Sequence, residues 1–401
     1  GHAIIGLCAA GILIRAVAPH LRDKHAEPPV IALAENGASA VPLLGGHHGA
    51  NELARRIASL CGGHAAVTTA SEVRFGFALD DPAPGFVLAN PENMKPATAA
   101  LLNGAGLALK GDSSPFPAQT ISAWAPGFSG ITLEVSEQDV PGADDHLVYH
   151  PKTLVMGLGC ERHAEPDELI ALAGEVLANS NLSPSSLAAV ASIDLKSDEA
   201  AIHAVAAHFG VPARFFTADE LSRETPRLKN PSEIVAKEVG VPGVAEAAAL
   251  AAAGSQSELI VEKTRSPRGT CAIARSPRPI LSLPGRVRGI LHVVGIGPGT
   301  PEWRAPAARA ALEASSDWVG YGLYLDLASD VKSGQQKHRF PLGGEEDRVR
   351  HAIALAKEGR EVALVCSGDA GIYAMAALVY EVVDLEPSRI AVNVIPGISA
   401  F

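Results

Sequence analysis

Three short glycine-containing segments near the carboxyl end each follow an apolar run that is typical of a buried strand. They are VVGIGPGT around Gly297, CSGDAGIY around Asp369 and VIPGISAF around Ser399. Glycine permits positive φ and lets a ligand approach the backbone closely, and small residues after the carboxyl end of a strand leave room for a ligand. We therefore expect the three segments to line one crevice.

The first segment places Gly295, Gly297 and Gly299 at the end of a strand, a pattern that often binds phosphate. A dinucleotide fingerprint needs its glycines to open directly into a helix, whereas Pro298 lies inside this turn and TPEWRAP precedes the helix. Dinucleotide binding is therefore not supported, and a plain strand-to-helix turn stays open. Asp369 has an alternative role as the cap of the following helix.

The segment GGHHGANE is a second candidate site. Gly45 and Gly46 free the backbone before a helix whose N-terminal amides can receive a carboxylate. His47 and His48 can relay protons near neutral pH, and Glu52, one turn later, can orient one of them. The alternative is that two adjacent histidines in a surface turn are solvated and point apart.

The five cysteines are scattered singly, without the spacing of a disulfide framework or a zinc site. No metal site is therefore expected. Cys8 and Cys160 each follow a predicted strand, where a nucleophile could lie, but a small buried packing residue is the simpler role for both. Arg15 and Arg162 are candidates for binding substrate carboxylates, and ordinary surface charges are the alternative.

Composition limits the classes of function. The chain has 401 residues, 47% of them hydrophobic and 19% charged, which indicates a globular enzyme of two or three domains. The net charge of −11 and the absence of a basic run argue against nucleic acid and favour a small-molecule partner. The opening GHAIIGLCAAGILIRAVA is interrupted by Arg15, so we expect a strand and a helix, no membrane span, no targeting signal and a cytoplasmic protein.

Apolar runs alternate with helical patterns along the chain, which predicts an α/β fold of several domains with small parallel three-layer units. In the first unit, AIIGLC and PVIALA are expected strands, and ANELARRIASL is an expected helix with Leu53, Ile57 and Leu60 on its inner face. The expected parts are an α/β domain at 1–80, an irregular middle region at 81–150, a second α/β domain at 151–278, a linker at 279–289 and a last α/β domain at 290–401.

The region 290–401 resembles the tetrapyrrole methylases, especially precorrin-3B C(17)-methyltransferase. The resemblance rests on VGIGPGT, GYGLYLDL, SGDAGIYAMA and VIPGISAF, in matching order and spacing. It implies a domain that binds S-adenosylmethionine, largely through backbone groups, and that commonly forms dimers. The residues implied to contact or adjoin S-adenosylmethionine are Gly297, Pro298, Gly299, Ser367, Gly368, Asp369, Ile372, Tyr373, Ser399 and Ala400.

The family's second domain would begin where this sequence stops, at Phe401, and the sequence starts at Gly1 without a methionine. We therefore expect a piece of a longer protein, with half of the cofactor cleft outside it. Methyl transfer is expected of the longer protein. The chemistry needs few protein groups, because holding an electrophilic sulfonium methyl in line with a nucleophilic macrocycle carbon supplies much of the acceleration.

The region 1–280 resembles the cobalt-precorrin-5A hydrolases. The matching stretches include GLCAAGILIRAVAPHLRDK, LLGGHHGANELARRIA, MGLGCER, SIDLKSDE and NPSEIVAKEVGVPGVAEAAAL. Such enzymes open a ring lactone of a tetrapyrrole and release acetaldehyde. The resemblance implies a precorrin or cobalt-precorrin substrate with many acetate and propionate arms, for which Arg15, Gly45, Gly46 and Arg162 are the candidate contacts.

Together these features predict a bifunctional enzyme of corrin ring synthesis, a methyltransferase with a hydrolase-like region. One alternative is that the region 1–280 only binds tetrapyrroles and hands them over, without turnover. Another is a nucleotide-binding α/β protein, which rests on the glycine-rich turn alone.

Overall fold

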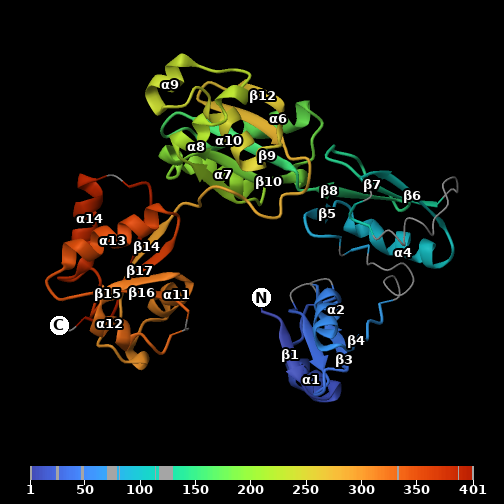
Figure 1. Ribbon diagram of the computed structural model, residues 1–401, viewed down its shortest axis with the longest axis horizontal. Coiled ribbons are helices and arrows are strands. Elements are labelled where there is room, and N and C mark those ends of the chain that lie inside the picture. The colour runs from blue at the N-terminus through green and yellow to red at the C-terminus, as the bar shows by residue number, and fades with distance from the viewer. Residues whose placement is uncertain are drawn as a thin grey trace. The chain divides into compact units, whose positions relative to one another are not determined.

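The computed structural model describes residues 2–23, 27–46, 49–69, 79–80, 82–112, 114–116, 130–331, 334–386 and 388–399. They form two compact units, Gly1–Lys152 and Thr153–Phe401. Figure 1 shows their elements, which build four sheets with mostly parallel strands and helices against them. The predicted multidomain α/β class is confirmed.

The first sheet of the first unit has the strand order β1-β2-β3-β4. Its strands are β1 (Ile4–Leu7), β2 (Val30–Leu33), β3 (Ser39–Leu44) and β4 (His64–Ala65), and its helices are α1 (Ala10–Val17) and α2 (Ala50–Cys61). The predicted strands and helix are confirmed. The inner face of α2 is smaller than predicted, however, because Ala54 and Ala58 are buried while Leu60 is 80% exposed.

The region expected to be irregular forms a four-stranded sheet of its own, in the order β5-β8-β7-β6. The strands are β5 (Phe86–Leu88), β6 (Gly106–Gly111), β7 (Gly130–Val135) and β8 (His146–Pro151), with α4 (Met94–Leu102) packed on them. Prolines and glycines between these strands interrupt the alternation of apolar and polar residues, so the sequence did not predict the strands. Tyr149 is fully buried here, and its hydroxyl donates to the Leu79 carbonyl at 2.8 Å.

The third sheet, in the second unit, has the order β11-β10-β9-β13-β12. Three parallel strands are β9 (Leu154–Cys160), β10 (Leu187–Ile193) and β11 (Ala213–Phe216), and β12 (Glu258–Arg265) and β13 (Gly269–Arg275) form an antiparallel hairpin at the other side. Helices α6 (Pro166–Asn179) and α7 (Ala200–His208) share one hydrophobic core, and α8 (Ala218–Ser222) and α10 (Val244–Ala253) share another.

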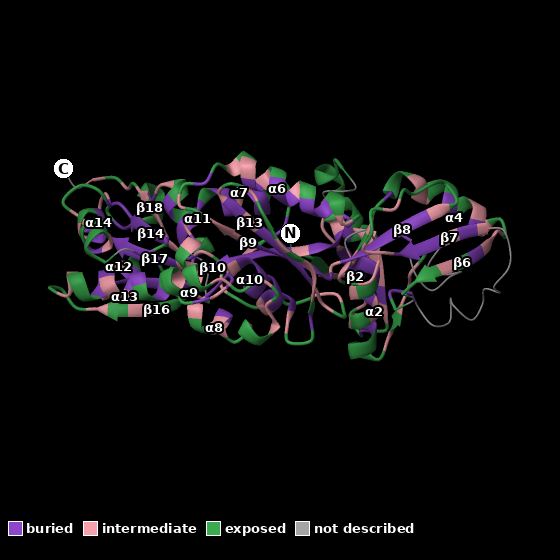
Figure 2. Ribbon diagram, turned by 90° about the horizontal axis from the view of Figure 1, so that it is seen from above, coloured by how far each residue is buried: buried purple, intermediate pink, exposed green. Residues whose placement is uncertain are grey.

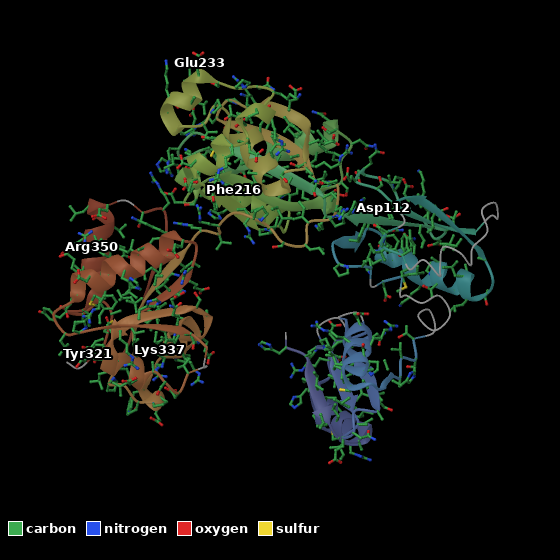
Figure 3. The ribbon with its side chains drawn as sticks, in the orientation of Figure 1. Asp112, Phe216, Glu233, Tyr321, Lys337 and Arg350 are labelled. Atoms are coloured by element: carbon green, nitrogen blue, oxygen red, sulfur yellow. The ribbon has the colours of Figure 1, made fainter. Side chains whose placement is uncertain are left out.

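Helix α10 packs closely against the middle of this sheet because the contact is made by the small residues alanine and glycine. A Cβ on Gly157 of β9 would lie 1.9 Å from the carbonyl oxygen of Ala245, so only glycine fits there. The preceding helix α9 (Glu233–Val239) has no buried residue, and Figure 3 shows Glu233 at its outer end. Gly240 has a left-handed backbone conformation and ends α9.

The fourth sheet is entirely parallel, in the order β16-β15-β17-β14-β18. Its strands are β14 (Ile290–Gly295), β15 (Asp317–Tyr321), β16 (Gln336–Phe340), β17 (Glu361–Cys366) and β18 (Ala391–Ile395), and its helices are α11 (Pro306–Ala314), α12 (Gly322–Leu327), α13 (Glu345–Lys357) and α14 (Met375–Leu385). Figure 2 shows β14 and β17 as continuous buried strands. Such apolar runs are typical of parallel strands covered on both faces.

Candidate functional site

The three glycine-containing segments follow the carboxyl ends of three adjacent strands, β17, β14 and β18. They meet at one edge of the fourth sheet. The amide of Gly297 donates to the carbonyl of Gly368 at 3.1 Å, and the amide of Gly368 donates back to Gly297 at 3.0 Å. The predicted convergence of the loops is therefore present in the structure.

This convergence requires glycine. A Cβ on Gly397 would lie 2.2 Å from the Gly368 carbonyl oxygen and 2.6 Å from that of Gly295, and both atoms belong to the backbone. A Cβ on Gly295 would lie 2.5 Å from the same Gly368 oxygen. Gly299 has a φ of 109°, and its Cβ would lie 2.8 Å from Leu327 at the end of α12. The loops thus pack backbone against backbone.

The carboxylate of Asp369 joins two of the loops. Its Oδ1 accepts a hydrogen bond from the Gly371 amide at 2.7 Å, and its Oδ2 accepts one from the Gly397 amide at 3.1 Å. The alternative role as a helix cap is wrong, because α14 has Ala374 at its N-cap without any side-chain cap bond. Asp369 holds the site together.

Large apolar side chains stand exposed beyond the carboxyl ends of all five strands of this sheet. Trp303 follows β14, Leu323 follows β15, Leu342 follows β16, Ile372 and Tyr373 follow β17, and Ile398 follows β18. Tyr373 is 96% exposed and has a φ of 48°, a conformation that costs a non-glycine residue about 1–3 kcal/mol and clusters at functional sites. Such an edge suits a ligand with apolar surface.

The other predicted cofactor contacts lie at the same edge. Pro298 and Ser367 are exposed, Gly368 and Ser399 are half-buried, and Gly297 is buried. Ala400 lies outside the described residues. The glycine-rich loop is anchored by Arg304, whose guanidinium donates to both carboxylate oxygens of Asp330, at 2.8 and 2.9 Å, and to the Leu327 carbonyl.

The segment GGHHGANE precedes α2 as predicted. Gly45 has a φ of 76°, and its Cβ would lie 2.7 Å from Pro29, so this position also requires glycine. The Ala50 amide, in the first turn of α2, donates to the Gly45 carbonyl at 3.1 Å. Gly46 is half-buried and Glu52 is exposed, 3.8 Å from Arg55. His47 and His48 lie outside the described residues, and their proposed proton relay stays a prediction.

Arg15 and Arg162 both have intramolecular partners. Arg15 lies exposed on α1 and donates to the Gly11 carbonyl at 3.1 Å. Arg162, just beyond β9, donates to Asp198 Oδ1 at 2.6 Å and to Glu199 Oε2 at 3.4 Å. Any substrate carboxylate would have to share these guanidinium groups with their present acceptors.

Arg162 belongs to a charged group at the carboxyl ends of β9 and β10. Glu199 is 4% exposed, accepts the His163 amide at 2.9 Å and lies 4.0 Å from the Lys196 ammonium. Burial lowers the pKa of Lys196 and raises the pKa of the Cys160 thiol to about 11. Cys160 is thus mostly protonated at neutral pH, which argues against the nucleophile role.

Sequence reasoning missed the acids of this group. Asp198 and Glu199 directly follow the SIDLKS stretch at the end of a predicted strand. Residues just beyond the carboxyl end of a strand often belong to a site, so this position could have identified them. It also missed Glu246, which is fully buried in α10 and accepts the amides of Lys229, Asn230 and Lys263. Burial raises the pKa of Glu246, but these hydrogen bonds outweigh it and hold the pKa below its usual range.

The chain matches three protein families in succession. They are Cobalamin synthesis G N-terminal at residues 1–72, Cobalamin synthesis G C-terminus at 154–274, and Tetrapyrrole (Corrin/Porphyrin) Methylases at 290–401. The sheets and the edge described above thus define a hydrolase-like cobalamin synthesis protein fused to a tetrapyrrole methylase region. The chain belongs to the cobalamin synthesis G family, and its last region is of the tetrapyrrole methylase family.

Three relatives illustrate this composition. Protein CobE of Sinorhizobium sp is 50% identical over 121 residues, 30% of this chain and 79% of that protein. Cobalt-precorrin-5A hydrolase of Priestia megaterium is 29% identical over 296 residues, 68% of this chain and 78% of that protein. Probable cobalt-factor III C(17)-methyltransferase of Salmonella typhimurium is 40% identical over 111 residues, 28% of this chain, and the chain spans 46% of its length.

Among the described residues, no helix has both the length and the apolar character needed to cross a membrane.

Proposed function

We propose that the protein acts in corrin ring assembly during cobalamin biosynthesis. Its last region would bind S-adenosylmethionine for methylation of precorrin-3B at ring carbon 17, and the region 1–280 would open the ring lactone of a cobalt-precorrin-5A-type substrate and release acetaldehyde. The partner is a tetrapyrrole small molecule in the cytoplasm, and a homodimer is the expected assembly. The observation that carries the methylase assignment is the backbone-packed edge joined by Asp369.

The edge of the fourth sheet fits S-adenosylmethionine in three respects. Its loops pack backbone against backbone at glycines that no side chain can replace, so little side-chain bulk lies where they meet, which suits a cofactor held mainly by main-chain groups. Its exposed apolar residues can cover the adenosyl part. The Asp369 carboxylate is half-buried and lies between two loops, where its negative charge favours a nearby sulfonium cation.

The residues that would hold the cofactor are therefore Gly297, Gly299, Gly368, Asp369 and the apolar pair Ile372 and Tyr373. The cofactor itself supplies an electrophilic methyl group. The protein's contribution is to bind and orient it and to exclude water, and neither task requires a catalytic acid or base. The rate then depends on how firmly the three loops keep their mutual positions.

The hydrolase-like assignment is supported by two polar positions. One is the segment from Gly45 to Glu52, where the N-terminus of α2 follows two glycines. The other is the group around Arg162, where Lys196 has a lowered pKa because of burial. A lysine whose pKa is lowered gives up its proton more readily than an ordinary lysine. The hand-over alternative would use the helix N-terminus for binding but would not need a lysine with a lowered pKa.

The test uses the purified protein at its full natural length, with S-adenosylmethionine labelled in its methyl group. Incubation with precorrin-3B is expected to add one labelled methyl group to the macrocycle, measured by mass spectrometry. Incubation with cobalt-precorrin-5A is expected to release acetaldehyde, measured by derivatisation and chromatography. Macrocycle binding without acetaldehyde would favour the hand-over alternative. A thermal shift with nucleotides but none with S-adenosylhomocysteine would overturn the methylase assignment.

A further inference from the structure

A cavity of about 240 Å³ lies in the second unit, at the edge of the fourth sheet opposite to the three loops. One side is formed by Asp194, Leu195 and Ser197, after β10, and by Phe215 of β11. The other is formed by 286–289 before β14, by the end of α13, and by 388–390 before β18. It is therefore separate from the proposed cofactor site.

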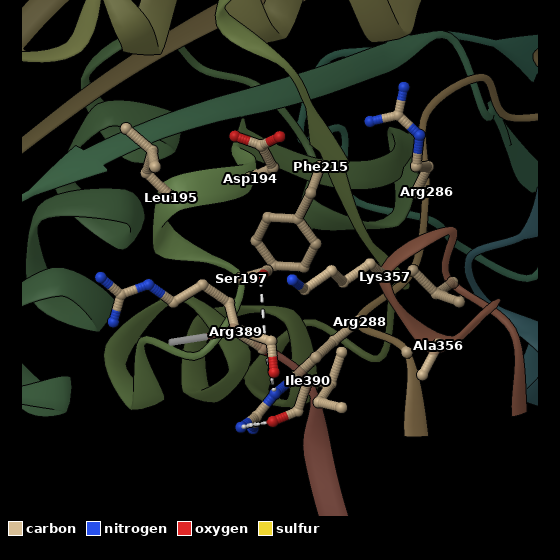
Figure 4. A pocket seen from close by; sticks show the side chains of 13 residues that line it. Asp194, Leu195, Ser197, Phe215, Arg286, Arg288, Ala356, Lys357, Arg389 and Ile390 are labelled. Carbon is tan, nitrogen blue, oxygen red and sulfur yellow. Dashed lines mark hydrogen bonds between the residues drawn. The ribbon is translucent and has the colours of Figure 1, made fainter. Parts of the chain in front are cut away.

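Positive charge dominates this cavity. Its lining contains Arg286, Arg288, Lys357 and Arg389, against the single acid Asp194. The chain as a whole carries a net charge of −11, so four cations around one small cavity reverse the general trend. In Figure 4 Lys357 extends toward the Phe215 ring, whereas the guanidinium groups of Arg286 and Arg389 point away from that ring on opposite sides.

The cations are only partly neutralised by the protein itself. Arg286 donates to Glu220 at 2.8 Å and Arg389 to Asp198 at 3.0 Å, each through one terminal nitrogen. Arg288 donates to the backbone carbonyls of Arg389 and Ile390, at 3.1 and 3.2 Å, which carry no net charge. Each guanidinium has five N–H donors, so donors remain for a ligand.

A buried hydroxyl in the lining supports a polar ligand independently. Ser388 is 9% exposed and lines the cavity, and its Oγ has no hydrogen-bond partner among the described residues. Leaving a buried hydroxyl unpaired costs about 1–3 kcal/mol. An acceptor atom in the cavity would satisfy this hydroxyl with a small movement of the side chain.

We propose that this cavity binds the oxyanion groups of a small organic ligand, either carboxylates or phosphates. Arginine forks and a lysine ammonium recognise both, by bidentate hydrogen bonds and by point charge. The volume admits a small polyanion or one or two acidic arms of a larger molecule, and not a whole macrocycle. This inference is independent of the proposed methylase and hydrolase activities, since neither requires the cavity.

The two anion types are distinguished by calorimetric titration of the whole chain with citrate and with inorganic phosphate at low ionic strength. At least one is expected to bind at one site, and the stronger of the two identifies the chemistry. Lys357→Gln is expected to weaken that binding at least tenfold, because it removes a charge that extends into the cavity. Lys237→Gln removes the same charge from exposed helix α9 and is the matched control.

Ser388→Ala provides a second variant that separates binding from folding. Because the hydroxyl is already unpaired, its removal is expected to leave the unfolding temperature unchanged or raised, while affinity for the anion falls severalfold. The proposal is overturned if neither anion binds the wild-type chain. It is also overturned if Lys237→Gln weakens binding as much as Lys357→Gln, since the effect would then be one of overall charge.

Discussion

The second unit contains two sheet edges at which parallel strands end, and different interactions hold the loops together at each. At the fourth sheet, the loops beyond β14, β17 and β18 meet through glycine backbone and one bridging carboxylate. At the third sheet, the segments beyond β9 and β10 meet through charged side chains, with Arg162 paired to Asp198 and Glu199. One edge is held by close packing of the main chain, the other by ion pairs.

This difference predicts how the stability of each edge responds to substitution, pH and ionic strength. Backbone packing tolerates no added atom, so a single methyl group should be severe there, and salt should matter little. An ion-paired edge tolerates added volume better but depends on charge, so it should respond to charge removal, pH and ionic strength. The predictions below test this contrast, beginning with the largest expected effect.

Gly397→Ala should be the most damaging single change. The new Cβ would lie 2.2 Å from the Gly368 carbonyl oxygen, so the loops must separate, at a cost of about 3 kcal/mol in the free energy of unfolding. Affinity for S-adenosylhomocysteine is expected to fall at least a hundredfold by calorimetry. The control is Gly174→Ala in α6, where the Cβ meets no atom within 4 Å. Retained affinity in Gly397→Ala would show that the convergence is not needed.

Arg162→Ala should be nearly as destabilising at the other edge. It leaves Glu199, 4% exposed, and Asp198 without their main cation. We expect a loss of about 2–3 kcal/mol by urea unfolding, below the range for fully buried pairs because Arg162 is partly exposed. Arg223→Ala removes an exposed arginine and is the control.

The same variant makes a prediction about pH. Burial raises the pKa of Asp198, but hydrogen bonds from Arg162 and Arg389 outweigh it and hold the pKa below its ordinary value. A lowered folded-state pKa stabilises the protein above the unfolded value, about 3.9, and this stabilisation is lost as the pH falls through the folded value. The stability difference between wild type and Arg162→Ala should therefore be full at neutral pH and shrink below about pH 4. A difference that does not change with pH would contradict an ion-paired edge.

Asp369→Ala should have an intermediate effect, since it removes the hydrogen bond to Gly397 of the neighbouring loop and the one to Gly371 within its own loop, but adds no clash. We expect a loss of about 2 kcal/mol in stability and an approximately tenfold loss of affinity for S-adenosylhomocysteine, which corresponds to about 1.4 kcal/mol. Asp384→Ala on the exposed face of α14 controls for the change of charge. Equal affinities in the two variants would show that Asp369 has no part in the site.

The fourth sheet could be predicted from the sequence because its signals are local. Buried runs such as EVALVC at β17 are followed within two residues by glycine, and glycine just beyond a parallel strand indicates a loop with little room for side chains. The bridge from Asp369 to the Gly397 amide could not be predicted, since it joins residues 28 positions apart. That contact depends on β14 lying between β17 and β18, which the order of the strands along the chain does not reveal.

In the third sheet and the middle region, several features could not be predicted from the sequence. Arg162 was recognised, but its partners Asp198 and Glu199 were not, because a charged residue in a loop looks like any solvated surface residue until the fold buries it. The sheet of the middle region was missed because prolines and glycines between its short strands weaken the pattern of alternation. Leu60 was expected inside and is exposed, because Ala54 and Ala58, with the partly buried Leu53 and Ile57, fill the contact between α2 and its sheet.

Tyr373→Gly should give the smallest effect, and one with opposite signs for stability and binding. Tyr373 has a φ of 48° and is 96% exposed, so it adds strain and little burial. Glycine relieves the strain but increases the entropy of the unfolded chain, leaving an expected gain of about 1 kcal/mol in stability. Affinity for S-adenosylhomocysteine should fall severalfold, because an apolar ring is lost from the edge. The control, Tyr380→Ala on α14, removes a tyrosine of ordinary conformation. It should neither increase stability nor lower the affinity for S-adenosylhomocysteine. If Tyr373→Gly instead gains stability and keeps full affinity, the strained ring is not retained for ligand binding, and the edge is held by its backbone alone.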